Sequence, residues 1–181
     1  MKLVILDRDG VINFDSDAFI KSPREWVPIP GSLEAIARLK RAQYRVVIAT
    51  NQSGVARGLF DMDTLNTIHM KMIHAIRQRG AEIDGIFICP HGPDDGCDCR
   101  KPAAGLFDQI AMRFKRNLNG VFAVGDSERD IVAAGKAGAR PVLVLTGKGL
   151  KTQQNSSSVT GIPVFNDLAA FSRALLNEEI S

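Results

Sequence analysis

Two aspartates stand one residue apart at the end of an apolar run near the N-terminus. Asp7 and Asp9 follow the run Leu3–Leu6, and Gly10 comes directly after them. Carboxylates this close repel each other unless a cation lies between them or one of them holds a proton. The pair therefore predicts an acidic functional site, with an ordinary Asp–Gly turn after a strand as the alternative.

Acids follow a second apolar run in the same way. Asp126 comes directly after Gly120–Gly125. Mg²⁺ is typically held by one or two carboxylates together with water and substrate phosphate, so Asp126 is the natural third acid of a magnesium site with Asp7 and Asp9. Asp130 lies one turn further on. It could bind the metal indirectly or cap the following helix, and capping is slightly favoured.

Polar donors follow another apolar run, Arg45–Ala49. The segment Thr50–Gly54 offers a hydroxyl and backbone amides, and Arg57 comes soon after it. Hydroxyls and amides at the end of a strand can hold phosphate oxygens. The segment is therefore a candidate phosphate site, and a polar loop with no special use is the alternative.

Three cysteines and a histidine fall within eleven residues, at Cys89, His91, Cys97 and Cys99, and they include every cysteine of the chain. Three thiolates and one imidazole match a closed, tetrahedral zinc site, and reduced spectator thiols are the alternative. Four protein ligands leave no position for water, so the zinc would be structural and would stiffen the loop 89–101. The spacings are tighter than those of common zinc fingers, which disfavours a nucleic-acid finger.

Two cations, Arg100 and Lys101, come directly after the last cysteine. A zinc ion bound by the preceding residues would therefore hold both at a fixed place. The guanidinium of Arg100 suits a bidentate contact with an oxyanion, and the ammonium of Lys101 is a compact point charge.

The elements that must position these groups alternate between strands and helices. Such alternation predicts an α/β fold with a doubly wound, Rossmann-like parallel sheet, in which polar residues at the carboxyl ends of the strands share one edge. The strands are expected at 3–6, 45–50, 85–89, 120–125, 141–145 and near Val164. One helix is expected to begin after Ser32 as its N-cap, and three more are expected at 64–79, 104–115 and 167–177. Asp167 is the expected N-cap of the last helix. Residues 153–160 are expected to form a polar loop.

Residues 13–30 show no sustained period and contain three prolines. A loop this long in a compact domain is usually functional, so it is predicted to fold over the site. Trp26 is interpreted as a packing residue that anchors this loop rather than as a substrate platform. His69 and His74 are five residues apart on a predicted helix, so they do not face one ligand and are interpreted as surface or packing residues.

Composition limits the possible classes of protein. The 181 residues suit a single domain, 1–181, and 45% apolar with 24% charged residues is ordinary for a globular protein. The formal charge of +3 is small and scattered, which disfavours a nucleic-acid partner. No apolar run approaches the ~18 residues of a membrane span, and no leader is evident. We therefore expect a cytoplasmic protein without a membrane partner, and a monomer.

The four polar motifs resemble those of phosphatases of the haloacid dehalogenase (HAD) superfamily. Asp7-x-Asp9-Gly, Thr50, Lys101 and Gly125–Asp126 occur in the same order, over nearly the whole chain. The resemblance implies that Asp7 is a nucleophile that forms an aspartyl-phosphate and that Asp9 is the general acid and base. It also implies that Thr50 and Lys101 stabilise the phosphoryl group. The catalytic Mg²⁺ would be bound by Asp7, the Asp9 backbone carbonyl and Asp126.

Longer segments, Asp7–Asn13, Thr50–Gly58 and the cysteine loop, resemble the heptose bisphosphate phosphatase family. The resemblance implies hydrolysis of the C7 phosphate of a heptose 1,7-bisphosphate, in the synthesis of lipopolysaccharide-core precursors. It implies an essentially capless fold in which 14–30 and the zinc loop enclose a phosphorylated sugar. The implied substrate contacts are Asn51, Gln52, Ser53, Arg57 and Arg100.

Two other functions compete with this one. Histidinol-phosphate phosphatases share the zinc loop, although a free-standing chain argues mildly against them. A non-catalytic, zinc-stiffened binding module is a candidate from another class, and the intact pair Asp7 and Asp9 speaks against it. Ser127 stands where some family members carry a lysine that contacts substrate, which leaves the polar contacts open.

Overall fold

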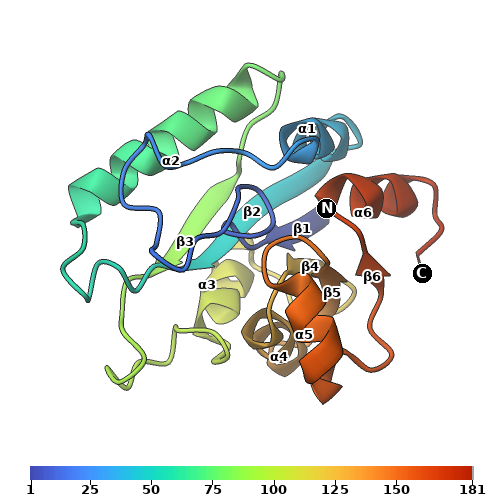
Figure 1. The fold of residues 1–181 in the computed structure, drawn as a ribbon. Helices are drawn as coiled ribbons and strands as arrows, with labels where there is room; N and C mark the ends of the chain where they lie inside the picture. The colour runs from blue at the N-terminus through green and yellow to red at the C-terminus, as the bar shows by residue number, and fades with distance from the viewer. Residues whose placement is uncertain (181) are drawn as a thin grey trace.

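The computed structural model describes residues 1–180, which form a central sheet with helices on both faces (Figure 1). All six strands are parallel and are arranged in the order β3-β2-β1-β4-β5-β6. The strands are β1 (Lys2–Leu6), β2 (Tyr44–Asn51), β3 (Gly85–Cys89), β4 (Phe122–Gly125), β5 (Arg140–Val144) and β6 (Val164–Phe165). The predicted doubly wound, Rossmann-like α/β fold is confirmed.

The helices form two layers. They are α1 (Ser32–Arg41), α2 (Met62–Arg77), α3 (Gly105–Phe114), α4 (Glu128–Lys136), α5 (Gly149–Asn155) and α6 (Leu168–Leu176), with a 3₁₀ turn at Ser157–Val159. One apolar core lies under α1, α2 and α6, and a second lies under α3 and α4 on the opposite face of the sheet (Figure 1). The sheet is thus buried on both faces, as parallel sheets normally are.

Strand β1 supplies both cores because side chains alternate along a strand. Val4 and Leu6 belong to the core beneath α1, α2 and α6, whereas Leu3 and Ile5 belong to the core beneath α3 and α4. The chain runs outward from β1 to β2 and β3, then returns to β4 on the other side of β1. This reversal is the switch point where open α/β sheets place ligands, and the end of β1 lies there.

The loop between β1 and α1 is anchored by Trp26. Its side chain is 1% exposed and belongs to the core beneath α2. The ammonium of Lys71 lies 5.7 Å from the centre of the indole ring and donates a hydrogen bond to the backbone oxygen of Trp26. The prediction of a packing role for Trp26 is confirmed.

Several predicted local features differ from the structure. The N-cap of α1 is Gly31, with a φ of 83°, and not Ser32. The hydroxyl of Ser32 instead donates to the backbone oxygen of Ile12, which fastens the preceding loop to the helix. Helix α2 begins two residues before the predicted start, because Asp61 caps it through the backbone N–H of Thr64. Asp167 caps α6, as predicted.

The prediction of a polar loop over 153–160 is wrong. Helix α5 continues to Asn155, and the 3₁₀ turn follows at Ser157–Val159. Contacts with distant residues stabilise this region: Thr152 donates to the backbone oxygen of Asp126, and the carboxylate of Glu128 accepts from the hydroxyls of Ser156 and Ser158. These partners lie 26 to 30 residues away in sequence, so local pattern did not reveal them.

No helix among residues 1–180 combines the length and the apolar character needed to span a bilayer.

Candidate active site

A cavity of about 200 Å³ opens at the carboxyl ends of β1, β2 and β4. Its walls come from these strand ends, the loop after β1, the cysteine loop, and the starts of α4 and α5. The lining residues are Asp7, Asp9, Asp15, Ser16, Asp17, Phe19, Ile20, Asn51, Gln52, Ser53, Arg57, Arg100, Lys101, Asp126, Arg129 and Lys148.

Three buried acids lie at the base of the site, and two of them, Asp7 and Asp126, line the cavity. Asp7, Asp126 and Asp130, hereafter the acid cluster, each offer a carboxylate oxygen, and these oxygens lie within 4.8 Å of one another. Burial raises the pKa of Asp7 to about 6 and, together with the charges of Asp130 and Asp7, raises the pKa of Asp126 to about 8. The carboxylates are thus held closer together than their charges favour. Hard oxygen ligands in this state fit a divalent cation such as Mg²⁺.

Lys101 provides the one positive charge buried beside these acids in the described residues 1–180. Its ammonium lies 3.0 Å from Asp7 Oδ1 and 2.6 Å from Asp130 Oδ1, and it donates to the backbone oxygen of Ala49 at 2.8 Å. Burial lowers the pKa of Lys101, but the two acids outweigh this effect and raise it above its ordinary value. Lys101 is therefore a fixed cation.

Asp126 is positioned by close backbone contacts from two loops. Its Oδ2 accepts a hydrogen bond from the backbone N–H of Lys148 at 2.7 Å. A Cβ atom at Gly10 or at Gly147 would overlap the same carboxylate, and both glycines have positive φ values, 82° and 57°. Only glycine combines this backbone conformation with this approach, so both positions serve the carboxylate of Asp126.

Asp130 has two roles. Its Oδ2 accepts from the backbone N–H of Ser127 at 3.0 Å and from the hydroxyl of Ser127, which completes a capping box at the start of α4. The predicted capping role is confirmed. Its Oδ1 meanwhile pairs with Lys101, a contact that sequence spacing did not indicate.

Asp9 is held apart from the acid cluster by donors of its own. Its carboxylate accepts from the guanidinium of Arg8 at 2.9 Å, from the amide of Asn13 at 2.9 Å and from the amide of Gln52 at 2.8 Å. Burial alone raises the pKa of Asp9, but the charge of Arg8 and these hydrogen bonds hold it below its ordinary value.

The polar segment at the end of β2 forms hydrogen bonds both with Lys101 and with Asp9. Asn51 exchanges two hydrogen bonds of 3.0 Å with the backbone N–H and oxygen of Lys101. The amide of Gln52 donates to Asp9 and to the hydroxyl of Thr50, whose side chain is 1% exposed. Ser53 and Arg57 line the cavity. The predicted residues therefore converge, although several of their donors already bind protein atoms.

Sequence reasoning missed two cations of the cavity wall. Arg129 follows Asp126 by three residues, at the start of α4, and Lys148 precedes α5. Burial and the nearby charge of Arg129 lower the pKa of Arg100, and Arg57 adds to the effect. Arg129 could have been found from its place in the first turn after a strand that ends in an acid. The contacts of Lys148 depend on the unpredicted start of α5.

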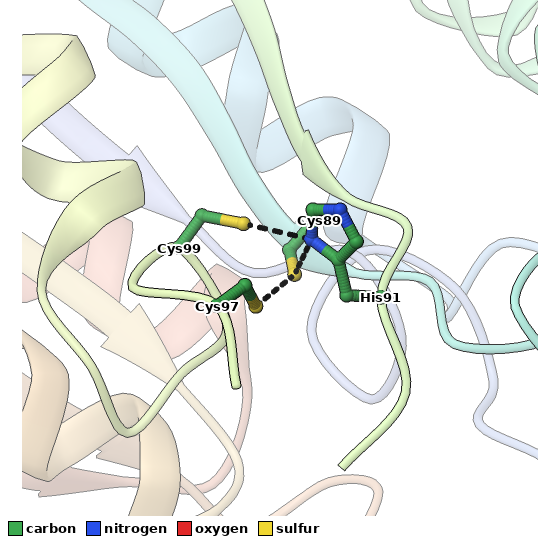
Figure 2. Close-up of side chains that lie close together, drawn as sticks. All are labelled: Cys89, His91, Cys97 and Cys99. Atoms are coloured by element: carbon green, nitrogen blue, oxygen red, sulfur yellow. Dashed lines mark hydrogen bonds between the residues drawn. The ribbon is translucent and has the colours of Figure 1, made fainter. Parts of the chain in front are cut away.

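The cysteine loop after β3 brings together all four of its predicted ligands (Figure 2). Cys89, His91, Cys97 and Cys99, hereafter the sulfur cluster, have ligand atoms within 4.8 Å of one another. The Nδ1 of His91 lies 3.3 Å from Cys99 Sγ and 3.6 Å from Cys89 Sγ, and the Sγ atoms of Cys89 and Cys97 are 3.7 Å apart. Tetrahedral zinc with ordinary Zn–S and Zn–N bonds separates its ligands by about 3.5–3.8 Å. The set fits zinc.

Known proteins match the chain over almost its whole length. A family described as HAD-hydrolase-like matches residues 98–171. D-glycero-β-D-manno-heptose-1,7-bisphosphate 7-phosphatase of Bordetella bronchiseptica is 60% identical, over 98% of this chain and 99% of the relative. The enzyme of that name from Pseudomonas putida is 52% identical, over 97% of this chain and 100% of the relative.

A solved structure gives the same result. The crystal structure of D,D-heptose 1,7-bisphosphate phosphatase from B. bronchiseptica, complexed with magnesium and phosphate, superposes with a TM-score of 0.97 over 98% of this chain and 99% of that chain. The fold and its acidic site define a HAD-like hydrolase. Within that class, the chain belongs to the family of D-glycero-β-D-manno-heptose-1,7-bisphosphate 7-phosphatases.

Proposed function

We propose that the protein hydrolyses the C7 phosphate of D-glycero-β-D-manno-heptose 1,7-bisphosphate. The observation that carries the proposal is a cavity lined by two residues of the acid cluster, Asp7 and Asp126, and by arginines, in a chain 60% identical to an enzyme of that name. Catalysis would use Asp7, Asp9, Thr50 and Lys101. A place in lipopolysaccharide-core precursor synthesis, a cytoplasmic location and a monomeric state stay predictions.

Asp7 is the nucleophile in this proposal. Its Oδ1 accepts from the backbone N–H of Arg8 at 2.8 Å and pairs with Lys101, whereas Oδ2 has no hydrogen-bond partner among residues 1–180. Oδ2 therefore attacks phosphorus. The Oδ2–P bond forms, the bond between phosphorus and the sugar oxygen breaks, and its electron pair leaves with the sugar. Water then attacks the aspartyl-phosphate, which regenerates Asp7 and releases phosphate.

Asp9 would transfer the protons of both steps. It gives a proton to the departing sugar oxygen, then takes one from the attacking water. Its pKa is low in the unliganded protein, because Arg8 and two amides stabilise the carboxylate. The negative charge of an entering phosphate beside it favours the protonated form, which the first step requires.

The remaining polar groups would neutralise and orient the phosphoryl group. A magnesium ion held by Asp7, Asp126 and the backbone carbonyl of Asp9 would supply positive charge that offsets the repulsion between carboxylate and phosphate. Lys101 is fixed beside the attacking carboxylate, where its charge stabilises the transferring group. The hydroxyl of Thr50 lies in the same network through Gln52.

The rim of the cavity favours a substrate with two phosphates. Arg57, Arg100 and Arg129 all line the cavity. The charges of Arg129 and Arg57, together with burial, lower the pKa of Arg100. A second phosphate would relieve the repulsion among these arginines, and each arginine can donate two parallel hydrogen bonds to two phosphate oxygens. Asn51, Gln52 and Ser53 line the same wall and would contact the sugar.

The decisive test compares kcat/KM for heptose 1,7-bisphosphate, heptose 7-phosphate and histidinol phosphate. We expect the bisphosphate to be preferred, and we expect Arg129→Ala to reduce that preference roughly 10-fold through the loss of a charged hydrogen bond. Arg113→Ala on the exposed side of α3 is the matched control. A clear preference of the parent enzyme for histidinol phosphate would replace the proposed substrate, and no turnover of any ester would favour a binding module.

A further inference from the structure

Arg8 lies between the two acids of the first motif but, unlike them, is not among the cavity-lining residues in the described range 1–180. Alternation along β1 places Leu6 toward the core beneath α2, and Arg8, two residues later, continues on that side with no exposed surface. Its guanidinium meets the carboxylate of Asp9 through Nε at 3.1 Å and through one terminal nitrogen at 2.9 Å and 3.1 Å. A fully buried cation thus clamps one acid of the active site.

The other terminal nitrogen of Arg8 contacts His69 on α2. The Nε2 atom of His69 lies 3.1 Å from it, and the imidazole is 5% exposed. Arginine can only donate, so Nε2 must accept and the ring proton must be on Nδ1. Burial lowers the pKa of His69 to about 4, and the charge of Arg8 contributes, so the ring is neutral at pH 7 and can accept.

We infer that His69 is a positioning residue for Asp9 that acts through Arg8. The inference deepens the proposed function, since it rests on Asp9 as the acid of phosphoryl transfer. His69 itself is not among the residues that line the cavity in the described chain 1–180. His69 accepts from one terminal nitrogen of the planar Arg8 guanidinium, and the opposite edge of that group binds the carboxylate of Asp9.

The planarity of the guanidinium makes this contact directional. Holding one terminal nitrogen at Nε2 fixes the rotation of the whole plane, and the plane, together with the amides of Asn13 and Gln52, sets where the carboxylate of Asp9 lies. Without an acceptor at His69, a buried N–H of Arg8 has no partner, which is costly. The terminal nitrogen of Arg8 that donates to Asp9 also donates to the amide oxygen of Gln52 at 3.3 Å. Without its partner at His69, the guanidinium can rotate toward Gln52 and away from Asp9. Asp9 would then be held only by the amides of Asn13 and Gln52, and its carboxylate would be less precisely placed.

A displaced proton donor can be detected by comparing kcat/KM for esters whose leaving groups differ in their need for a proton. An alkyl phosphate needs its departing oxygen protonated, whereas 4-nitrophenyl phosphate releases a stable phenolate that needs no proton. Purely structural damage lowers kcat/KM for both esters by the same factor. Loss of a positioned acid lowers kcat/KM for the alkyl ester far more than for the aryl ester.

The experiment uses the full chain with Mg²⁺ and compares His69→Leu with His69→Gln. We expect His69→Leu to lower kcat/KM for the heptose ester about 10-fold, part of the ~10²- to 10⁴-fold that general acid catalysis contributes. For 4-nitrophenyl phosphate we expect a loss of less than about 2-fold, because the acid does not act there. His69→Gln restores an acceptor near the position of Nε2, so it should recover most of the activity.

Met72→Leu, a buried and volume-conserving change on the same helix, is the matched control and should affect both esters equally. Equal losses for the two esters in His69→Leu, or a His69→Gln variant no better than His69→Leu, would overturn the inference while leaving the proposed function intact. A parent enzyme that hydrolyses neither ester would instead refute the proposed function. If His69→Leu does not fold, His69→Met takes its place, since a thioether is only a weak acceptor: a loss confined to the alkyl ester supports the inference, and equal losses for the two esters overturn it.

Discussion

The acid cluster and the sulfur cluster differ in where their ligands come from. The acid cluster joins residues 7, 126 and 130, from the end of one strand and from the loop and helix that follow another. The sulfur cluster takes four ligands from residues 89–99, that is, from the last residue of β3 and the loop that follows it. The first therefore exists only once the sheet has formed, whereas the second can gather locally around a metal.

The two clusters also differ in access. Asp7 and Asp126 line the cavity, whereas none of the four sulfur-cluster residues is among its lining residues in the part of the chain that the structure describes. Three carboxylates leave positions for water and phosphate, while three thiolates and an imidazole fill a tetrahedron. The comparison assigns chemistry to the first site and rigidity to the second, and four changes test that division.

The largest effect is expected from Asp7→Asn. The amide removes the attacking oxygen, so kcat should fall by roughly 10⁴-fold or more, as for the loss of other nucleophiles. Initial rates with the bisphosphate measure it. Asp108→Asn, the same change on the exposed face of α3, should leave kcat unchanged. Turnover by Asp7→Asn at the rate of the parent would remove the chemical role of the acid cluster.

The second largest effect is expected from metal removal, which should distinguish the role of the acid cluster from that of the sulfur cluster. Chelation of Mg²⁺ should reduce activity at least ~10²-fold, because Lewis-acid stabilisation is worth several kcal/mol, and added Mg²⁺ should restore it. Circular dichroism should meanwhile show an intact fold. Elemental analysis of protein purified without added metal should find about one zinc per chain. Full activity in chelator, or a chain without zinc, would contradict one half of the division.

Cys97→Ser should have a smaller effect on activity than either change at the acid cluster. Loss of a zinc ligand loosens the loop that leads to Lys101, and a small displacement of that ammonium should lower kcat about 10-fold. Zinc content and the melting temperature should both fall. Asp94→Asn, an exposed change in the same loop, is the control. Unchanged zinc content and unchanged kcat in Cys97→Ser would show that the sulfur cluster does not support the site.

The smallest effect concerns stability and pH. In the metal-free folded protein the pKa of Asp7 is raised to about 6 and that of Asp126 to about 8. The lowered pKa of His69 acts in the opposite direction in the lower part of this interval, but two raised acids outweigh one ring, so the folded chain binds more protons than the unfolded chain. Its free energy of unfolding should therefore fall as pH rises from about 4 to about 8.

The decline is measured as the difference between the melting temperatures in chelator at about pH 5.5 and about pH 8, which lie within this interval. Asp126→Asn should flatten the decline, because the amide does not titrate, and saturating Mg²⁺ should do the same by neutralising the acids. A melting temperature that rises with pH in the metal-free parent would show that burial does not raise these pKa values.

Sequence alone predicted the features that repeat or cluster. The strands were visible as short apolar runs rich in Val, Ile and Leu, two of which are followed by acids, and the sulfur cluster was visible because its ligands lie close together in sequence. The convergence of residues 7 and 126 followed from the rule that parallel strands end at one edge, whereas Lys101 was expected in the site from the resemblance to the HAD motifs. The substrate contacts and catalytic roles assigned to single residues stay predictions.

The remaining features depend on contacts between distant residues. Ser32 was expected to cap its helix, but a backbone oxygen twenty residues earlier binds its hydroxyl. Helix α5 forms where a loop was expected, because Asp126 and Glu128 accept hydrogen bonds from it and from the turn that follows. His69 was interpreted as surface or packing, and its partner Arg8 lies 61 residues away. No periodicity reports such pairs.

The loop that Trp26 anchors sets a size limit on what can reach the nucleophile. Asp7 is 9% exposed at the base of a cavity of about 200 Å³, and Phe19 and Ile20 from that loop form part of its wall. A phosphate must therefore arrive on a slim, extended carrier such as the end of a polyol. We therefore expect phosphoserines on folded domains and the internal phosphates of a duplex to be excluded, because the groups that flank them are broader than the end of a polyol.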